Sequence, residues 1–273
     1  MKHALLAMLL LLAGCGRTDD ERWLGYVEGE DAFIAAPQAG WVARLGVQRG
    51  DVVNVGDKLF TLDDANQAAA RDQANAAIAL AQSQRVAGIA NLVLTQKELA
   101  RQAALLAAGA GTRQAYDVAK AAYDSAGAQV SQIDAQIAQA RAGLSGAAYQ
   151  LSQRDVVSRT AGRVQDVYFR AGEYAPAMTP VVSVLPPANI YVRFFVPESA
   201  FSRVKLGQRV AVGCDGCAAG IVATVTFIAA QEEFTPPVIF SRESRSKLVF
   251  KIEARAPGGL KLNPGQPVDV RPL

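Results

Sequence analysis

Residues 36–62 read APQAGWVARLGVQRGDVVNVGDKLFTL, and a diverged copy follows without gaps 122 residues later, where residues 158–184 read SRTAGRVQDVYFRAGEYAPAMTPVVSV. Glycine and aliphatic positions coincide in the two copies: Gly40 with Gly162, Val42 with Val164, Leu45 with Val167, Gly50 with Gly172, Leu59 with Val181, and Leu62 with Val184. Each copy has the pattern of short strands around a glycine turn, and about 30 residues bury too little apolar surface to fold alone. The two copies are therefore predicted to close on each other as one β-sandwich, formed by residues 31–64 and 153–186.

The residues between the copies, 65–152, are rich in Ala, Gln, Leu and Arg and contain no proline, which favours long helices. The second half carries an unbroken heptad pattern at Tyr116, Ala119, Tyr123, Ala126, Val130, Ile133, Ile137, Ala140, Leu144, Ala147 and Leu151. The first half keeps the spacing at Ile78, Leu92, Leu99 and Leu106, with Arg85 as an exception and with Ile89 and Ala103 interleaved. Gly109 and Gly111 interrupt the pattern. The sequence predicts an antiparallel coiled-coil hairpin about 60 Å long, with its glycine turn at the far tip.

Residues 187–273 contain β-branched and aromatic runs separated by Gly and Pro, the pattern of a small β-barrel with a short C-terminal tail. The predicted fold class is therefore α+β, elongated and multi-domain. Cys214 and Cys217 flank Asp215-Gly216, a favoured hairpin turn. A structural disulfide or idle thiols fit this pair better than a redox site, because strand residues follow it and a redox pair would begin a helix.

The N-terminus has the pattern of an export signal. Lys2 precedes an apolar run from Ala4 to Ala13, which is too short to span a bilayer and suits a signal peptide. The stretch from Leu11 to Cys15 resembles a bacterial lipobox, which implies that residues 1–14 are removed and that Cys15 carries lipid at the head of an anchored segment, residues 15–30. The alternative is an ordinary signal peptide that contains a cysteine. No later segment is expected to cross a membrane.

Composition argues against several classes of function. The only histidine, His3, lies in the predicted signal peptide, which removes histidine triads and most zinc sites. The chain has neither a P-loop nor a Gly-x-Ser-x-Gly motif. The net charge of +3 is small and evenly spread, and does not indicate nucleic-acid binding. The chain is predicted to be no enzyme and to hold neither cofactor nor metal.

The motif from Val47 to Asp63, VQRGDVVNVGDKLFTLD, resembles a half-motif of the biotinyl-lipoyl-like domain of periplasmic adaptor proteins, also called membrane fusion proteins of the haemolysin-secretion type. Gly50 and Gly56 suit turns with positive φ, and the aspartates suit local bonds to backbone N–H groups. In lipoyl and biotinyl carriers the modified lysine occupies the turn that joins the halves. Here the hairpin takes that place and Lys58 lies within one half, so no carrier function is expected.

The tip resembles the family's motif for docking outer-membrane channels, which is Arg-Leu-x-x-Leu, six residues, Ser, four residues and Asp. This chain has Arg101, Leu105, Thr112 and Asp117 at the matching spacing, with Gln102 in place of the first Leu. The resemblance implies that these four residues contact a channel. The alternative is that Thr112 caps the second helix, Asp117 is solvated and Leu105 belongs to the coiled-coil seam.

The last part of the chain resembles the subgroup that serves ABC exporters, through residues 233–237, 242–245, 248–250 and 262–267. The resemblance implies a lipid-anchored adaptor on the periplasmic side of the inner membrane of a Gram-negative bacterium. It would link an ABC-type exporter to a TolC-like channel and self-associate in a ring, for which the family implies six copies. Two alternatives stay open: an adaptor of a proton-driven RND pump, and a coiled-coil envelope scaffold with no transport role.

The lipobox generates a first test. Metabolic labelling with a palmitate analogue should mark the wild-type chain and leave Cys15→Ser unmarked, because the thiol of Cys15 is the predicted attachment atom. Equal labelling of the two chains would contradict the anchor.

Overall fold

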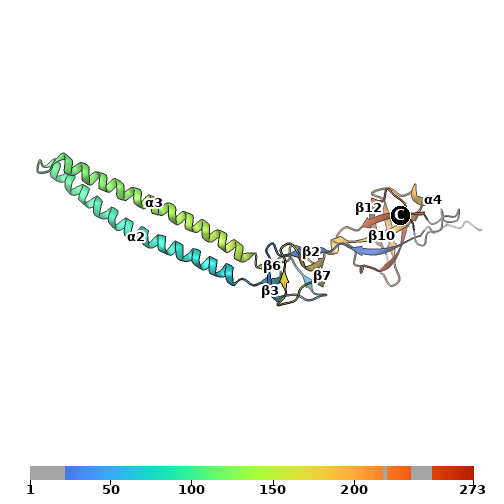
Figure 1. The fold of residues 1–273 in the computed structure, drawn as a ribbon. Coiled ribbons are helices and arrows are strands. Elements are labelled where there is room, and N and C mark those ends of the chain that lie inside the picture. Colours follow the sequence, from blue (N-terminus) through green and yellow to red (C-terminus); the bar gives the residue numbers. More distant parts are fainter. Residues whose placement is uncertain (1–21, 218–219, 235–247) are drawn as a thin grey trace, which may run out of the picture.

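The computed structural model describes residues 22–217, 220–234 and 248–273, and the molecule is elongated (Figure 1). A helical hairpin occupies one end, a two-sheet unit the middle and a barrel the other end. Cys15 with the rest of the predicted signal and anchor, Thr235 to Pro237, and residues 242–245 lie outside the described residues.

The two-sheet unit consists of two sheets with four strands each. In sheet order, the first contains β2 (Ala32–Ala35), β9 (Pro180–Leu185), β7 (Gly162–Val167) and β4 (Val52–Val53). The second contains β6 (Asp155–Val157), β5 (Lys58–Leu62), β3 (Gly40–Leu45) and β8 (Tyr174–Ala175). Adding 122 residues to β3, β4 and β5 places them on β7, β8 and β9, so the sequence repeat is a structural repeat with the same strand order in both sheets. One apolar core lies between the sheets, with Leu59, Phe60 and Val181 fully buried.

Reciprocal backbone hydrogen bonds join the two copies. The Gly50 N–H donates to the Val164 carbonyl at 2.9 Å, and at the equivalent place the Gly172 N–H donates to the Val42 carbonyl at 2.8 Å. The Val164 and Val42 N–H groups in turn donate to the carbonyls of Asp51 and Glu173, both at 2.8 Å. Each copy therefore satisfies backbone groups that the other leaves open, which is why neither forms a sheet alone.

The aspartates in the turns of the first copy accept local backbone N–H groups, as the sequence predicted. The Asp51 side chain accepts the Gln48 N–H at 2.7 Å, and the Asp57 side chain accepts the Asn54 N–H at 2.7 Å. In the second copy Glu173 replaces Asp51 and accepts the Arg170 N–H at 2.9 Å. A longer acid thus closes the same turn.

The second turns of the two copies have different residues at the position with positive φ. Gly56 has φ 94°, and its N–H donates to Ser158 at 2.8 Å; the equivalent residue, Met178, donates to Ala36 at 2.9 Å and has φ 60°. Met178 is the only non-glycine residue with positive φ in the described part of the chain, and its side chain is 75% exposed. The fold requires the left-handed conformation here, and Met178 adopts it at a cost that Gly56 avoids.

The hairpin consists of α2 (Ala65–Ala107) and α3 (Arg113–Ser152), which pack antiparallel along their length (Figure 1). In α3 the predicted seam is confirmed: Ala119, Ala126, Ile133 and Ile137 are buried, and the other seam positions are half-buried. Large and small residues alternate along this seam, which allows α2 to approach closely.

The seam of α2 differs in part from its prediction. Ile78, Leu92, Leu99 and Leu106 are half-buried as expected, and so are the interleaved Ile89 and Ala103, but Ala81 and Gly88 are buried more deeply, and Thr95 and Gln102 are half-buried as well. A Cβ on Gly88 would lie 3.1 Å from the Ile133 Cδ1, so a small residue is needed where the large α3 side chain enters. Arg85, the exception in the pattern, pairs with Asp134 across the hairpin.

Apolar residues of α2 also face outward. Leu80, Val86, Val93 and Leu94 are exposed, and α2 is long and apolar enough to cross a membrane by length and composition. The sequence was expected to contain no later segment long and apolar enough to cross a membrane, and α2 corrects that expectation. The pairing of α2 with α3 accounts for one face of the helix and leaves these side chains uncovered.

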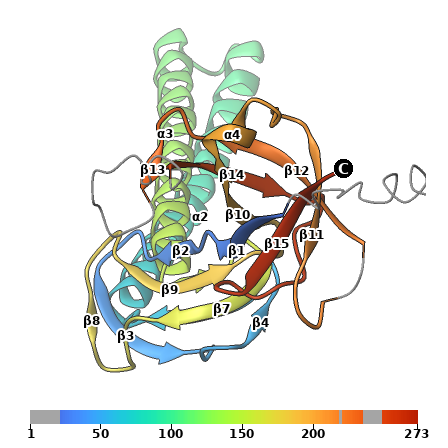
Figure 2. The same cartoon turned by 90° about the vertical axis from the view of Figure 1, so that its right-hand side faces the viewer.

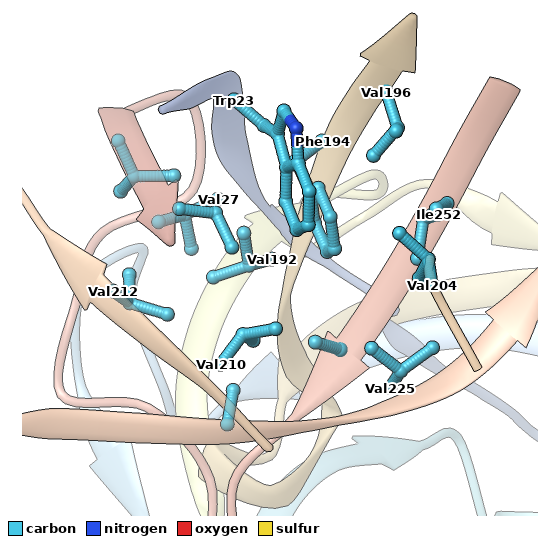
Figure 3. Packing of buried hydrophobic residues seen from close by; sticks show 14 of the residues in the cluster. Trp23, Val27, Val192, Phe194, Val196, Val204, Val210, Val212, Val225 and Ile252 are labelled. Carbon is cyan, nitrogen blue, oxygen red and sulfur yellow. The ribbon is translucent and has the colours of Figure 1, made fainter. Parts of the chain in front are cut away.

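The barrel is closed by six strands, in the order β10 (Ile190–Pro197), β1 (Trp23–Gly29), β15 (Pro267–Pro272), β11 (Arg209–Gly213), β12 (Ile221–Ile228) and β14 (Leu248–Arg255), with β14 pairing again with β10. The short β13 (Glu233–Phe234) pairs with β14, α4 (Glu198–Phe201) follows β10, and η2 (Pro187–Asn189) precedes it. Trp23 stacks on Phe194 with ring centroids 5.7 Å apart, within a core of valines (Figure 3). Residues 23–29, predicted as part of the anchored segment, therefore belong to the barrel.

The seam predicts the effect of a buried charge. Ile133→Asp should lower the free energy of unfolding by about 3 kcal/mol, because an uncompensated carboxylate would face Gly88 in a closed layer. Ser131→Asp, on the exposed side of the same helix, should have little effect. Circular dichroism melting compares the two variants, and equal melting curves would show that the seam is misassigned.

The turn at Met178 predicts a stabilising substitution. Met178→Gly should raise the free energy of unfolding by about 0.5 to 1 kcal/mol, because relief of the left-handed strain exceeds the added flexibility of the unfolded chain. Met178→Ala removes the same exposed side chain but keeps the strain, and should give no gain. Urea denaturation measures both, and a gain in the alanine variant would attribute the effect to the side chain.

Candidate functional site at the hairpin tip

The tip loop is built around two glycines. The Leu105 carbonyl accepts hydrogen bonds from the N–H groups of Ala110, at 2.9 Å, and Gly111, at 3.1 Å. Gly109 has φ 72°, and a Cβ on Gly111 would lie 3.0 Å from the Leu106 nitrogen. Larger residues at these places would open the loop, so the glycines hold the end of α2 against the start of α3.

Thr112 caps α3. Its Oγ1 accepts the Ala115 N–H at 3.1 Å, which satisfies one of the free donors of the first helical turn. The capping role considered from the sequence is therefore present. The residue stays exposed, so its methyl group and hydroxyl also form part of the surface at the tip.

The charged residues of the tip are paired only along their own helices. Arg101 Nη1 lies 3.1 Å from Glu98 Oε2, and Arg113 Nε lies 3.6 Å from Asp117 Oδ1. Exposed pairs of this kind contribute about 0.5 kcal/mol or less. Arg101 and Asp117 can therefore exchange these partners for groups of another protein at little cost.

Leu105 does not belong to the seam. It is 38% exposed, while its neighbour Leu106 is turned toward α3. Sequence reasoning missed Arg113, whose guanidinium carbon lies 5.9 Å from the centre of the Tyr116 ring. Its position directly after the capping threonine was the available signal.

We call the set Arg101, Leu105, Thr112, Arg113 and Asp117 the tip patch. All five lie within about two helical turns of the loop, at the end of the molecule farthest from the barrel (Figure 1). The patch combines one apolar side chain with two cations, a carboxylate and a hydroxyl. This mixture suits contact with the surface of another protein.

Cys214 and Cys217 are joined as a disulfide in the structure, with Cα atoms 5.3 Å apart. The Gln266 side-chain amide donates to the Cys214 Sγ at 3.1 Å, so the bridge packs against the loop before β15. The pair lies between the strands β11 and β12, and no helix begins at it among the described residues, which agrees with a structural role rather than a redox role. The oxidation state of the pair in the cell stays a prediction.

The outer face of the barrel carries a half-buried charge network. Arg193 of β10 lies between Glu28 of β1, at 2.6 Å, and Glu253 of β14, at 2.9 Å. The Tyr191 hydroxyl donates to Glu28 at 2.7 Å, and burial together with this carboxylate raises the pKa of Tyr191. The network ties three strands together across the closure of the barrel. Among the described ranges, no group of three or more His, Cys, Asp or Glu residues could hold a metal ion.

No family model matches the chain. A relative described as "UPF0194 membrane protein in asrC 5′region", from Acidithiobacillus ferridurans, is 30% identical over 131 residues, which cover 47% of this chain and 39% of that protein. The aligned region thus spans less than half the length of that relative.

Solved structures resemble the chain over nearly its whole length. MacA from Actinobacillus actinomycetemcomitans has a TM-score of 0.71 and 19% identity, and the match covers 93% of this chain and 78% of that one. The membrane fusion protein Spr0693 from Streptococcus pneumoniae R6 gives a TM-score of 0.55 and 19% identity, covering 93% and 98% of the two chains. A MacA–MexA chimaera that contains the Pseudomonas aeruginosa MexA α-hairpin gives 0.53 and 19%, covering 93% and 82%. The chain therefore has the fold of the membrane fusion proteins, or periplasmic adaptors, which is the family that its half-motifs and its tip spacing resemble.

Proposed function

We propose that the protein is a lipid-anchored periplasmic adaptor that links an ABC-type exporter of the inner membrane to a TolC-like outer-membrane channel. The observation that carries the proposal is the tip patch at the end of a hairpin about 60 Å long. A rigid projection with its exposed polar and apolar groups gathered at the far end is suited to reach a partner at a distance.

The middle of the molecule supports an adaptor more than a carrier. Residues 36–62 and 158–184 close on each other through reciprocal hydrogen bonds, which supports the biotinyl-lipoyl-like domain that the resemblance implies. In a carrier the turn between them would present a modified lysine, but here that position is occupied by α2 and α3. Lys58 lies in β5 and pairs with Asp155 at 2.8 Å, so it forms part of the sheet surface.

The barrel end is proposed to face the inner membrane and the transporter. Trp23 begins the barrel only eight residues after Cys15, so a lipid on Cys15 would hold the barrel close to the membrane surface. The ABC type is favoured by the family pattern in residues 262–267, which lead into β15. The Gly265 N–H in this segment donates to the Val27 carbonyl at 2.8 Å. An RND pump is the alternative partner, and a neighbouring gene for an ATP-binding subunit would separate the two.

Transport also needs several copies. One hairpin cannot enclose a conduit, so we propose that the chains assemble in a ring, with six as the number that the family implies. The protein would work without catalysis, by passing movements of the transporter through three joined rigid parts to the channel.

The tip patch predicts a loss of docking without a loss of folding. Leu105→Ser and Arg101→Asp should each weaken channel binding by about 2 kcal/mol, roughly thirtyfold, because each removes one of the proposed contact groups of the patch. Crosslinking to the channel and export should fall accordingly, while expression, lipidation and helicity stay at the wild-type level.

Leu94→Ser is the matched control, because it removes an exposed leucine of α2 that lies away from the tip, 66% exposed against 38% for Leu105. It should leave channel crosslinking unchanged. If both tip variants crosslink and export normally, the tip is only a capped turn, and the envelope scaffold becomes the better explanation.

A further inference from the structure

We infer that copies of this chain bind one another through two different edges of the two-sheet unit, with the β8 edge of one copy against the β4 edge of the next. The inference rests on the proposed function in one respect, namely that several copies stand side by side. It names the surfaces by which they would do so.

The starting observation is a symmetric backbone with asymmetric side chains. β4 and β8 occupy equivalent places in the repeat, and each is the edge strand of its sheet. At equivalent positions the β8 edge has Trp41 and Tyr174 where the β4 edge has Arg163 and Val52. Folding requires the same backbone at both edges, but it does not require one edge to be aromatic and the other cationic.

The β8 edge exposes large rings. Trp41 and Tyr174 are paired across β3 and β8, with ring centroids 5.4 Å apart in an edge-to-face arrangement. Their side chains are 56% and 50% exposed, and Met178 stands in the turn that follows β8. Exposed aromatic residues and methionine beside an edge strand are the composition of a protein interface.

The β4 edge carries apolar and cationic side chains that complement the aromatic rings of the β8 edge. Val52 is 69% exposed and Val55 is also exposed, which provides apolar area for a ring to cover. The Arg163 side chain reaches along this edge, with Nη1 3.4 Å from the Gly50 carbonyl. A guanidinium stacks well on tryptophan and tyrosine. Two β4 edges would bring two Arg163 side chains together, so this edge suits an aromatic partner better than a second β4 edge.

The positions of the two edges also suit a ring-shaped assembly of several copies. Figure 2 shows β4 and β8 on opposite sides of the two-sheet unit, in a view turned by 90° from the one that displays the length of the molecule. Copies with parallel long axes would therefore meet β8 edge to β4 edge. A contact between unlike surfaces repeats from copy to copy and closes when the rotation allows it. Each edge strand has only two residues, so side chains rather than a continued sheet would hold the contact.

Cysteine crosslinking in cells that express the full chain tests the pairing. Tyr174→Cys combined with Val52→Cys should give, on mild oxidation, a ladder of disulfide-linked species that extends beyond the dimer. Each single variant should give no ladder, because its introduced cysteine faces an edge of the neighbouring copy that carries no introduced cysteine. The other cysteines of the chain are present in both single variants and set the background.

The matched control combines Val52→Cys with Val118→Cys, since Val118 is also exposed, at 64% against 50% for Tyr174, but lies near the hairpin tip. This pair should give no ladder. Dimers from Tyr174→Cys alone would mean that like edges meet, and would overturn the inference. The absence of a ladder from the Tyr174 and Val52 pair would overturn it as well.

A second pair of variants tests the chemistry of the contact. Trp41→Ala and Arg163→Glu should each weaken self-association about tenfold in detergent-solubilised full chain, because each removes the ring or the guanidinium of the proposed stack. Arg163→Lys keeps the charge but loses the planar group and should fall between wild type and Arg163→Glu. Unchanged self-association in Trp41→Ala and Arg163→Glu would contradict the inference.

Channel crosslinking from the tip, measured in the same cells, separates this inference from the proposed function. Channel crosslinking without the ladder would contradict the edge pairing and would still support the adaptor function. A ladder without channel crosslinking would support the edge pairing and would contradict the proposed adaptor function.

Discussion

The reciprocal hydrogen bonds between the two copies are the constraint on which the other parts of the molecule depend. Gly50 and Gly172 donate to carbonyls of the opposite copy, which brings together two segments that are far apart in the chain. The same closure brings the ends of the hairpin together: the Leu62 N–H donates to the Arg154 carbonyl at 2.9 Å, just before α2 begins and just after α3 ends. The Arg154 guanidinium then donates to the Ala39 carbonyl at 2.9 Å, which joins the base of the hairpin to the sheet.

The hairpin is stabilised unequally by its two helices. α3 contributes the large residues of the seam, including Ile133 and Ile137, and α2 contributes small residues opposite them, such as Gly88. α2 also presents large residues such as Leu92 to its partner, and further apolar side chains such as Leu80 and Leu94 face outward. The helix is therefore apolar without having one apolar face. This arrangement explains why α2 resembles a membrane-spanning segment by length and composition.

The barrel contains a strand that could not be predicted from the sequence, because its partners are distant in the chain. β1 precedes the first copy of the repeat and β10 follows the second, yet they are neighbours through pairs such as Val27 with Val192. The two connections to the two-sheet unit run side by side, and the Glu30 N–H donates to the Asn189 carbonyl at 3.2 Å. A strand whose partners lie more than 160 residues away gives no local pattern of its own, which is why the sequence does not reveal residues 23–29 as a strand of the barrel.

The sequence by itself determined the mixed helix and sheet class, the hairpin between two half-motifs, the seam of α3 and the spacing of the four tip residues, because each of these depends on local periodicity or on a repeat. Only the tertiary structure decided which small residues of α2 face Ile133, that Leu105 lies outside the seam and that Arg113 joins the tip patch. It also decided that β1 closes the barrel and that Trp41 and Arg163 occupy opposite edges of one symmetric unit. These features depend on contacts between residues that are distant in the chain, and side-chain burial at such contacts is set by the partner rather than by the neighbours in sequence.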